Sequence, residues 1–334
     1  MKKIISLIMA AMMAIALTAC GNTDNSDTTT ATKENTAGDN NPTEITVTCF
    51  DGDGKEVQIT VPYNPERIVV LDFATLDILD NLGLSNRIVG VPNITLDYLS
   101  DYDNTDTYTN VGTIKTADME AIVALEPDII FMGGRLSDSY SELMDIAPVV
   151  RLTTDSSIGL LESVRKNGKT IASIFGLDAE VDEKLTDFDN RIAALSEVAE
   201  GKTAIVTMCS GGSASLLGND GRCSIIGTEI GFENVGVSDE VATATHGNEA
   251  SFEFYVSANP DYIFVMDRDG AIAGTVGTQQ LAKDIMENEL VMQTDAYRNG
   301  NLVYLEHPGV WYTGEGGITA FEYMLKDLET ALLK

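Results

Sequence analysis

Two arginines occupy equivalent positions in an internal repeat, and their chemistry suits an anionic ligand. Residues 117–135 read ADMEAIVALEPDIIFMGGR and residues 250–268 read ASFEFYVSANPDYIFVMDR, so both copies contain Pro-Asp and end in an arginine. Arg135 ends the first copy and Arg268 ends the second. A guanidinium keeps its positive charge at physiological pH and offers five N–H donors. The repeat therefore predicts two matching groups for an anion.

Each copy also predicts the element that positions its arginine. A helical pattern breaks at Pro-Asp and leads into a short apolar run, which is typical of a buried parallel strand. The carboxyl ends of such strands face the ligand in an open α/β sheet. We therefore expect an α/β protein of two similar lobes, each with a central, mostly parallel sheet and one arginine at its rim.

The remaining patterns divide the folded part of the chain into three segments. Residues 43–155 alternate strand and helix signals and form the N-terminal lobe, beginning with a hairpin around the turn at 51–54 and including a helix over 74–82. Residues 156–201 have helical spacing without a strand and link the lobes. Residues 202–334 form the C-terminal lobe, which ends in a helix over 318–333.

The first 42 residues indicate export and a lipid anchor. Lys2 and Lys3 precede a mostly apolar stretch over 4–17 that is short for a membrane span. The sequence LTAC that follows resembles the bacterial lipobox, which predicts a signal peptide over 1–19 and acylation of Cys20. An uncleaved helical anchor is the alternative. Residues 20–42 are too polar to fold and form a flexible tether, so the chain lies outside the cytoplasm, at the outer face of the cell membrane.

Charge and cysteine content narrow the possible partners. The chain has 52 acidic and 21 basic residues, and loss of Lys2 and Lys3 changes the net charge from −31 to −33. Nucleic acid is excluded, because phosphate contact needs a basic surface. After acylation of Cys20, Cys209 and Cys223 are a possible disulfide, or all remaining cysteines are free thiols. The chain contains no CxxC pair, so we do not expect a metal site built from cysteines.

Three further segments resemble a known protein family. The run PERIVVLDF over 65–73, residues 83–92 and the VGT at 111–113 are similar to the helical-linker class of substrate-binding lipoproteins. These proteins serve bacterial ABC importers of ferric siderophores, vitamin B12 and haem, and the resemblance covers nearly all of 43–334. Residues 246–268 and the Trp-Tyr pair at 311–312 resemble the branch that binds ferric catecholate siderophores. The resemblance implies two α/β lobes joined by one long helix, a cleft between them and little hinge opening. We expect the protein to be a monomer.

The resemblance also assigns roles to five residues. Arg135, Arg222 and Arg268 match arginines that line the family pocket, where a ferric tris-catecholate is a trianion. A tetradentate bis-catecholate leaves two positions of iron open, which His246 and Tyr312 would fill. The segment Glu-His-Pro-Gly at 306–309 and Glu315 after Tyr312 depart from the family pattern, which leaves the register of the iron-binding tyrosine open. His307 therefore stays a spare candidate. The cargo is the ferric siderophore, and no intrinsic cofactor is expected.

Glu120 and Glu253 occupy the same place in the two repeats, early in each helix. In the family, one glutamate per lobe docks onto arginines of the permease. The alternative is that an acid near a helix N-terminus only stabilises the helix. We expect permease docking, because the two residues form a pair.

Other functions compete with siderophore binding. Haem or cobalamin is the main alternative cargo, because a histidine and a tyrosine also suit haem. Zinc and manganese importers need clustered histidine and carboxylate ligands, and the chain has two histidines. A hydrolase lacks support, because neither GxSxG nor HExxH occurs. A plain adhesion lipoprotein would leave the repeat and its arginines unexplained.

Overall fold

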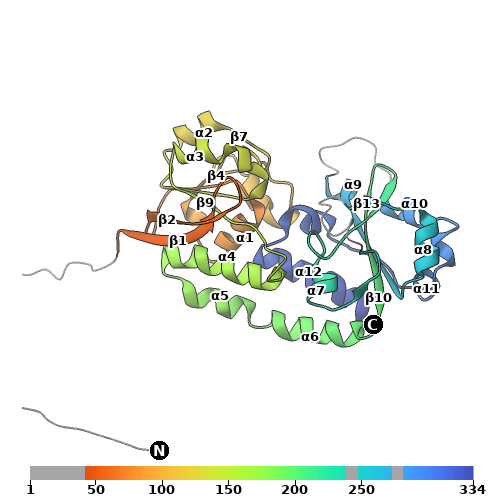
Figure 1. Ribbon diagram of the computed structural model, residues 1–334. Helices are drawn as coiled ribbons and strands as arrows, with labels where there is room; N and C mark the ends of the chain where they lie inside the picture. The colour runs from red at the N-terminus through yellow and green to blue at the C-terminus, as the bar shows by residue number, and fades with distance from the viewer. Residues whose placement is uncertain (1–41, 238–246, 273–280, 334) are drawn as a thin grey trace, which may run out of the picture. The chain divides into compact units, whose positions relative to one another are not determined.

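The computed structural model describes residues 42–237, 247–272 and 281–333 of the chain. Residues 42–334 form one compact unit with two lobes (Figure 1). The N-terminal lobe contains a seven-stranded sheet in the order β2-β1-β9-β8-β3-β4-β5. Its strands are β1 (Glu44–Phe50), β2 (Glu56–Pro62), β3 (Ile68–Val70), β4 (Ile88–Val91), β5 (Thr109–Asn110), β8 (Ile129–Met132) and β9 (Val149–Arg151).

The strand pattern of this sheet agrees with the sequence prediction. β1 and β2 form the expected antiparallel hairpin, and β9, β8, β3, β4 and β5 run parallel. The predicted helix after β3 is α1 (Phe73–Asn81), where Asp72 caps the first turn by accepting the N–H of Thr75 at 3.0 Å. The lobe also contains α2 (Met119–Ala124), α3 (Tyr140–Met144), the short strands β6 (Gly112–Thr113) and β7 (Thr116–Ala117), and 3₁₀ turns at Ser85–Arg87, Asp97–Asp103 and Gly134–Ser139.

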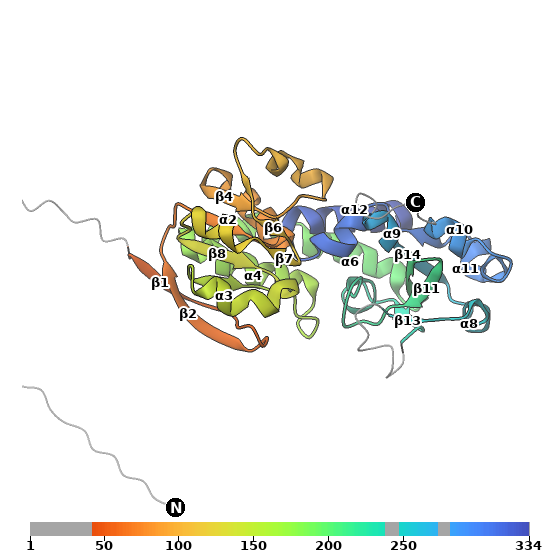
Figure 2. The same cartoon turned by 90° about the horizontal axis from the view of Figure 1, so that it is seen from above.

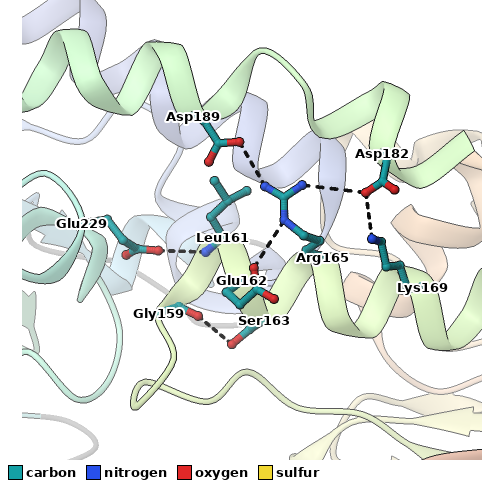
Figure 3. A network of polar contacts seen from close by, with 9 residues as sticks. All are labelled: Gly159, Leu161, Glu162, Ser163, Arg165, Lys169, Asp182, Asp189 and Glu229. Atoms are coloured by element: carbon teal, nitrogen blue, oxygen red, sulfur yellow. Dashed lines mark hydrogen bonds and ion pairs between the residues drawn. The ribbon is translucent and has the colours of Figure 1, made fainter. Parts of the chain in front are cut away.

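The segment between the lobes differs from the single long helix that the family resemblance implied. It is divided into α4 (Leu160–Phe175), α5 (Asp178–Leu185) and α6 (Phe188–Ala199), and α5 and α6 lead from one lobe to the other (Figure 1). α4 ends because Gly176 adopts a left-handed conformation with φ 69°. Figure 3 shows how side chains tie α4 to α5 and α6: Arg165 of α4 contacts Asp182 of α5 and Asp189 of α6.

The C-terminal lobe has a six-stranded sheet in the order β13-β11-β10-β14-β15, with β12 beside β10. The strands β10, β14 and β15 are parallel, as predicted for the core of the sheet. The strands are β10 (Thr203–Ser210), β11 (Ser213–Leu216), β12 (Glu233–Asn234), β13 (Asn248–Glu249), β14 (Tyr262–Asp267) and β15 (Leu302–Tyr304). Its helices are α7 (Ile225–Thr228), α8 (Phe252–Ala258), α9 (Arg268–Ala271), α10 (Ala282–Met286) and α11 (Asp295–Arg298), with a 3₁₀ turn at Val291–Gln293.

The sequence repeat is also a structural repeat. In each copy a short helix, α2 or α8, leads into an interior strand, β8 or β14. In the first copy, Asp128 of the Pro-Asp pair accepts the N–H groups of Glu66 and Arg67 at 2.9 and 2.8 Å, beside the start of β3. In the second, Asp261 accepts the N–H of Thr203, the first residue of β10, at 2.9 Å. Both carboxylates therefore fix the start of the neighbouring parallel strand.

The C-terminal helix α12 (Ile318–Leu332) connects the two lobes. The sequence placed it in the C-terminal lobe, but its first turn is bonded to α1, where Asp77 accepts the N–H groups of Thr319 and Ala320 at 3.0 and 2.9 Å. Further along, α12 packs on α6, with the rings of Phe321 and Phe188 5.0 Å apart. In both views α12 lies between the two sheets (Figure 1 and Figure 2). One continuous apolar core consequently includes residues of both lobes.

Candidate functional site

A cavity of about 420 Å³ lies where loops from both lobes meet. From the N-terminal lobe it is lined by residues that follow β3, β8 and β9, namely Asp72, Gly133 to Arg135, and 152–156. From the rest of the chain it is lined by residues 220–222 and by the segment 312–316, which precedes α12. The first group lies at the carboxyl ends of parallel strands, where open α/β sheets bind ligands.

Tyr312 is the centre of this site. It belongs to a single π-helical turn, Val310–Gly314, and such turns are often found at functional sites. Its backbone carbonyl accepts one hydrogen bond from Arg135 Nη2 at 2.8 Å and another from Arg222 Nε at 3.3 Å. One carbonyl therefore connects Arg135 of the N-terminal lobe to Arg222, which lies between β11 and α7.

The Tyr312 ring brings all three predicted arginines together. The guanidinium carbons of Arg222, Arg268 and Arg135 lie 4.5, 5.5 and 5.6 Å from the ring centroid, within the range of a cation–π contact. Arg268 Nε also donates to the phenol oxygen at 3.0 Å, and its Nη1 donates to Ser210 Oγ at 2.9 Å. Beneath these groups, Tyr312 is only 3% exposed. We call Arg135, Arg222 and Arg268 the arginine cluster.

The arginine cluster changes the acidity of Tyr312. Burial alone raises the pKa of a phenol, but the hydrogen bond from Arg268 and the charges of all three arginines outweigh it, so the pKa of Tyr312 is lowered. Crowding also affects the arginines themselves. Burial and the nearby charge of Arg222 lower the pKa of Arg135. The cluster thus favours negative charge, either on the phenol or on a ligand.

Two carboxyl groups stand beside the cluster, and the sequence predicted neither as part of the site. Glu315 lines the cavity and accepts the N–H of Cys223 at 3.1 Å. Burial raises the pKa of Glu315 to about 7, although the Cys223 N–H and Arg222 oppose the rise. Asp72 lines the same cavity and caps α1. The capping position of an aspartate before a helix was a usable signal for Asp72, whereas Glu315 was marked only by its departure from the family pattern after Tyr312.

Of the two histidines, only His307 lies in the part of the chain that the structure describes. His246 lies outside the residues that the structure describes. His307, the spare candidate, does not line the cavity: its Nδ1 is 2.6 Å from Asp327 Oδ1, and its backbone N–H donates to the other carboxylate oxygen at 3.0 Å. The same oxygen accepts the Trp311 indole N–H at 2.8 Å. Asp327 of α12 therefore anchors the segment that leads to Tyr312, and His307 has a structural role.

The cysteines and possible metal ligands narrow the chemistry further. Cys49, Cys209 and Cys223 are buried free thiols, so the disulfide considered for the last two is not formed. Cys20 lies outside the described residues. Among the residues that are described, no group of three or more His, Cys, Asp or Glu side chains could hold a metal ion.

No helix in the same part of the chain is both long and apolar enough to cross a membrane.

The two paired glutamates are exposed on separate lobes. Glu120 lies in the first turn of α2, and Glu253 lies in the first turn of α8. Across 42–237, 247–272 and 281–333, no hydrogen bond or ion pair engages either side-chain carboxylate. Both are therefore available to an external partner.

Most of the folded region matches known proteins. The family profile described as "Periplasmic binding protein" matches residues 68–308. The petrobactin-binding protein YclQ of Bacillus subtilis is 34% identical over 339 residues, covering 100% of both chains, and its crystal structure superposes with a TM-score of 0.78 over 87% of this chain and 99% of that one. The ferric-anguibactin-binding protein FatB of Vibrio anguillarum is 28% identical over 81% of this chain and 84% of its own.

A second solved structure has a similar resemblance. The periplasmic catecholate-siderophore binding protein VctP of Vibrio cholerae is 30% identical and has a TM-score of 0.76, covering 86% of this chain and 100% of its own. These similarities agree with the family resemblance and the fold class that the sequence indicated.

Proposed function

Because the chain belongs to the periplasmic binding protein family, we propose that it captures a ferric siderophore in the cavity between its lobes and delivers it to an ABC importer. Its similarity to proteins named for petrobactin, anguibactin and catecholate siderophores supports this cargo. The observation that carries the proposal is the convergence of three arginines on Tyr312. The description of the family as binding proteins supports a role as a receptor rather than as an enzyme.

The arginine cluster favours a compact trianion such as a ferric catecholate. A unit charge at about 4 Å from a guanidinium gains about 4 kcal/mol at an effective dielectric constant near 20, before desolvation. The contacts of Arg135 and Arg222 to the Tyr312 carbonyl are hydrogen bonds that ligand oxygens can replace. Haem, the alternative cargo, is a broad apolar ring, whereas much of the cavity lining is charged or hydroxylated.

Tyr312 and His246 are the proposed protein ligands of iron. A phenolate is a hard anionic donor for Fe³⁺, and the lowered pKa of Tyr312 favours that form. In the structure the phenol oxygen is bonded to Arg268, which must shift or share that oxygen when iron binds. We assign His246 the second open position of a tetradentate complex, as its sequence context suggests.

The protein is proposed to work at the cell surface together with a permease. Acylation of Cys20 would hold the protein at the outer face of the cell membrane through the tether at 20–42. The related YfiY of Bacillus subtilis, a probable siderophore-binding lipoprotein, supports this arrangement. Glu120 and Glu253 would dock onto the two halves of the permease, and the protein would act as a monomer.

Fluorescence of Trp311, the only tryptophan, provides the first test. The compact unit 42–334 is titrated with a ferric linear bis-catecholate, with its iron-free form and with haemin. We expect saturable quenching by the ferric complex at sub-micromolar concentration and weak binding of the other two. Tight quenching by haemin alone would contradict siderophore binding and indicate that the protein binds haem for uptake.

Variants then test the individual roles. Each arginine of the cluster replaced by Gln should weaken binding about tenfold to a hundredfold, since a hydrogen bond to a charged group contributes about 1.5–3 kcal/mol. The matched control Arg298→Gln changes an exposed arginine of α11. Tyr312→Phe and His246→Ala should change the ligand-to-iron charge-transfer absorption of the bound complex, whereas Tyr297→Phe should not. An unchanged spectrum in Tyr312→Phe would contradict phenolate ligation.

A further inference from the structure

Glu315 lines the cavity together with Arg135 and Arg222. We propose that Glu315 is the internal counter-ion of Arg135 and Arg222, the two arginines that line the cavity with it, and that it takes up one proton when an anionic ligand enters the cavity. The inference rests on the proposed function, because it requires an anion to bind beside the arginines. It adds a residue that balances the positive charge of the arginines in the cavity.

Glu315 is connected to the arginine cluster through the turn at Cys223. Glu315 Oε1 accepts the Cys223 N–H at 3.1 Å. Cys223 has a positive φ of 61°, which is an unfavourable conformation for a residue with a side chain. The bond to Glu315 therefore stabilises the turn that holds the preceding residue, Arg222, whose Nε contacts the Tyr312 carbonyl. The segment 312–315 thus contacts both the side chain of Arg222 and the N–H of the residue that follows it.

Charges of both signs face Glu315. Arg222 and Arg135 favour its ionised form, whereas Glu229, at the end of α7, disfavours it. The buried thiol of Cys223 lies beside it, and Asp155 and Asp220 line the same cavity. Burial is the largest influence and places the pKa of Glu315 at about 7. A carboxyl group balanced in this way changes its protonation when the local charge changes slightly.

A bound anion changes this balance in one direction. A trianion among the arginines brings like charge close to Glu315 and withdraws the arginines that stabilise its carboxylate, so the pKa of Glu315 rises. One proton then passes from solvent to the carboxylate, and no other bond is formed or broken at this residue. Because binding takes up a proton, affinity falls as pH rises above neutrality, by up to about tenfold per pH unit.

Calorimetry of the compact unit with the ferric linear bis-catecholate measures this proton directly. Titrations near pH 8 in buffers with different ionisation enthalpies give the number of protons exchanged on binding. Relative to Glu315→Gln, the wild-type protein should take up close to one more proton, and its affinity should fall more steeply with pH. Glu315→Gln keeps an oxygen for the Cys223 N–H, whereas Glu315→Ala loses both the charge and the bond. The matched control Glu66→Gln changes an exposed glutamate that does not line the cavity.

The comparison with Glu315→Gln separates the outcomes. A proton released by Tyr312 on binding iron is common to both proteins and cancels in the difference. Equal proton counts and parallel pH profiles in the wild type and Glu315→Gln would overturn the inference and leave siderophore binding intact. Absence of saturable binding in the wild-type protein would overturn both proposals.

Discussion

At the scale of single residues, one tyrosine organises most of the site. The backbone carbonyl of Tyr312 accepts hydrogen bonds from Arg135 and Arg222, and its hydroxyl oxygen accepts one from Arg268. Its ring is within cation–π distance of all three guanidinium groups. Tyr312 lies in a π-helical turn, a local geometry that is frequent at functional sites. The contacts with Tyr312 hold these cations together, which reduces the cost of ordering them when a ligand binds.

The acidity of Tyr312 should depend on Arg268. Arg268→Gln removes the strongest of the contacts that lower the pKa of Tyr312, so the phenol should titrate at a higher pH than in the wild type. The measurement is the difference in phenolate absorbance between each protein and its Tyr312→Phe counterpart. Arg298→Gln should leave the titration unchanged. An unchanged pKa in Arg268→Gln would show that this guanidinium does not govern the phenol.

The sequence predicted some of these residues and missed others for a physical reason. Arg135 and Arg268 follow interior strands of a repeat, so periodicity located them. Arg222 and Tyr312 were found only through the family resemblance, because they lie in irregular segments. Glu315 was missed because its pairing with Cys223 depends on two loops that meet only in the folded chain.

At the scale of elements, α12 depends on a carboxylate from α1. Asp77→Ala leaves the N–H groups of Thr319 and Ala320 without their acceptor, and each such loss costs about 1–3 kcal/mol. We expect the free energy of unfolding to fall by about 2–4 kcal/mol in urea titrations. Asp77→Asn retains one oxygen and should lose less. Equal losses in the two variants would argue against capping as the cause.

Asp77 also gives stability a pH dependence of defined sign. Burial raises its pKa from 3.8 to about 6, against the opposing hydrogen bonds of Ala320 and Thr319. Between these values the folded state binds more protons than the unfolded state. The free energy of unfolding should therefore fall as pH rises from about 4 to about 6 and then level off. Subtracting the Asp77→Asn curve isolates this contribution, and a flat difference would contradict it.

The contacts in Figure 3 differ in how much they contribute to the free energy of unfolding. Glu229, at the end of α7, accepts the Leu161 N–H at 2.8 Å and so caps α4 from the other lobe. Arg165 instead forms pairs with three carboxylates that are each more than half exposed. Glu229→Ala should cost about 1 kcal/mol of unfolding free energy in low and high salt. Arg165→Met should cost less, and high salt should remove its effect; a larger loss in Arg165→Met would reverse this ranking.

At the scale of the whole molecule, the architecture was easier to predict than its connections. Two α/β lobes followed from the repeat, and the solved relatives have the same fold. The break after α4 depends on the left-handed conformation of Gly176, a glycine that the helical periodicity passes over. The attachment of α12 to α1 depends on a contact between residues 77 and 319, which local patterns do not contain.

Docking is a property of the two lobes together. Glu120→Ala and Glu253→Ala combined should reduce ligand-stimulated ATPase activity of the reconstituted importer about tenfold or more, because a charged hydrogen bond contributes about 1.5–3 kcal/mol. Siderophore affinity should stay unchanged, since neither residue lines the cavity. Glu66→Ala is the matched control. Full ATPase stimulation by the double variant would show that these two glutamates do not contribute to docking.

The cap at Asp77 also sets an order of events during biosynthesis. α1 emerges from the ribosome early, whereas the turn that it caps belongs to α12, where Thr319 lies 242 positions further along the chain than Asp77. Until that helix arrives, the surface of α1 that will contact it is uncovered and the N-terminal lobe is incomplete. A polypeptide built in this way cannot complete its N-terminal lobe until α12 has been made.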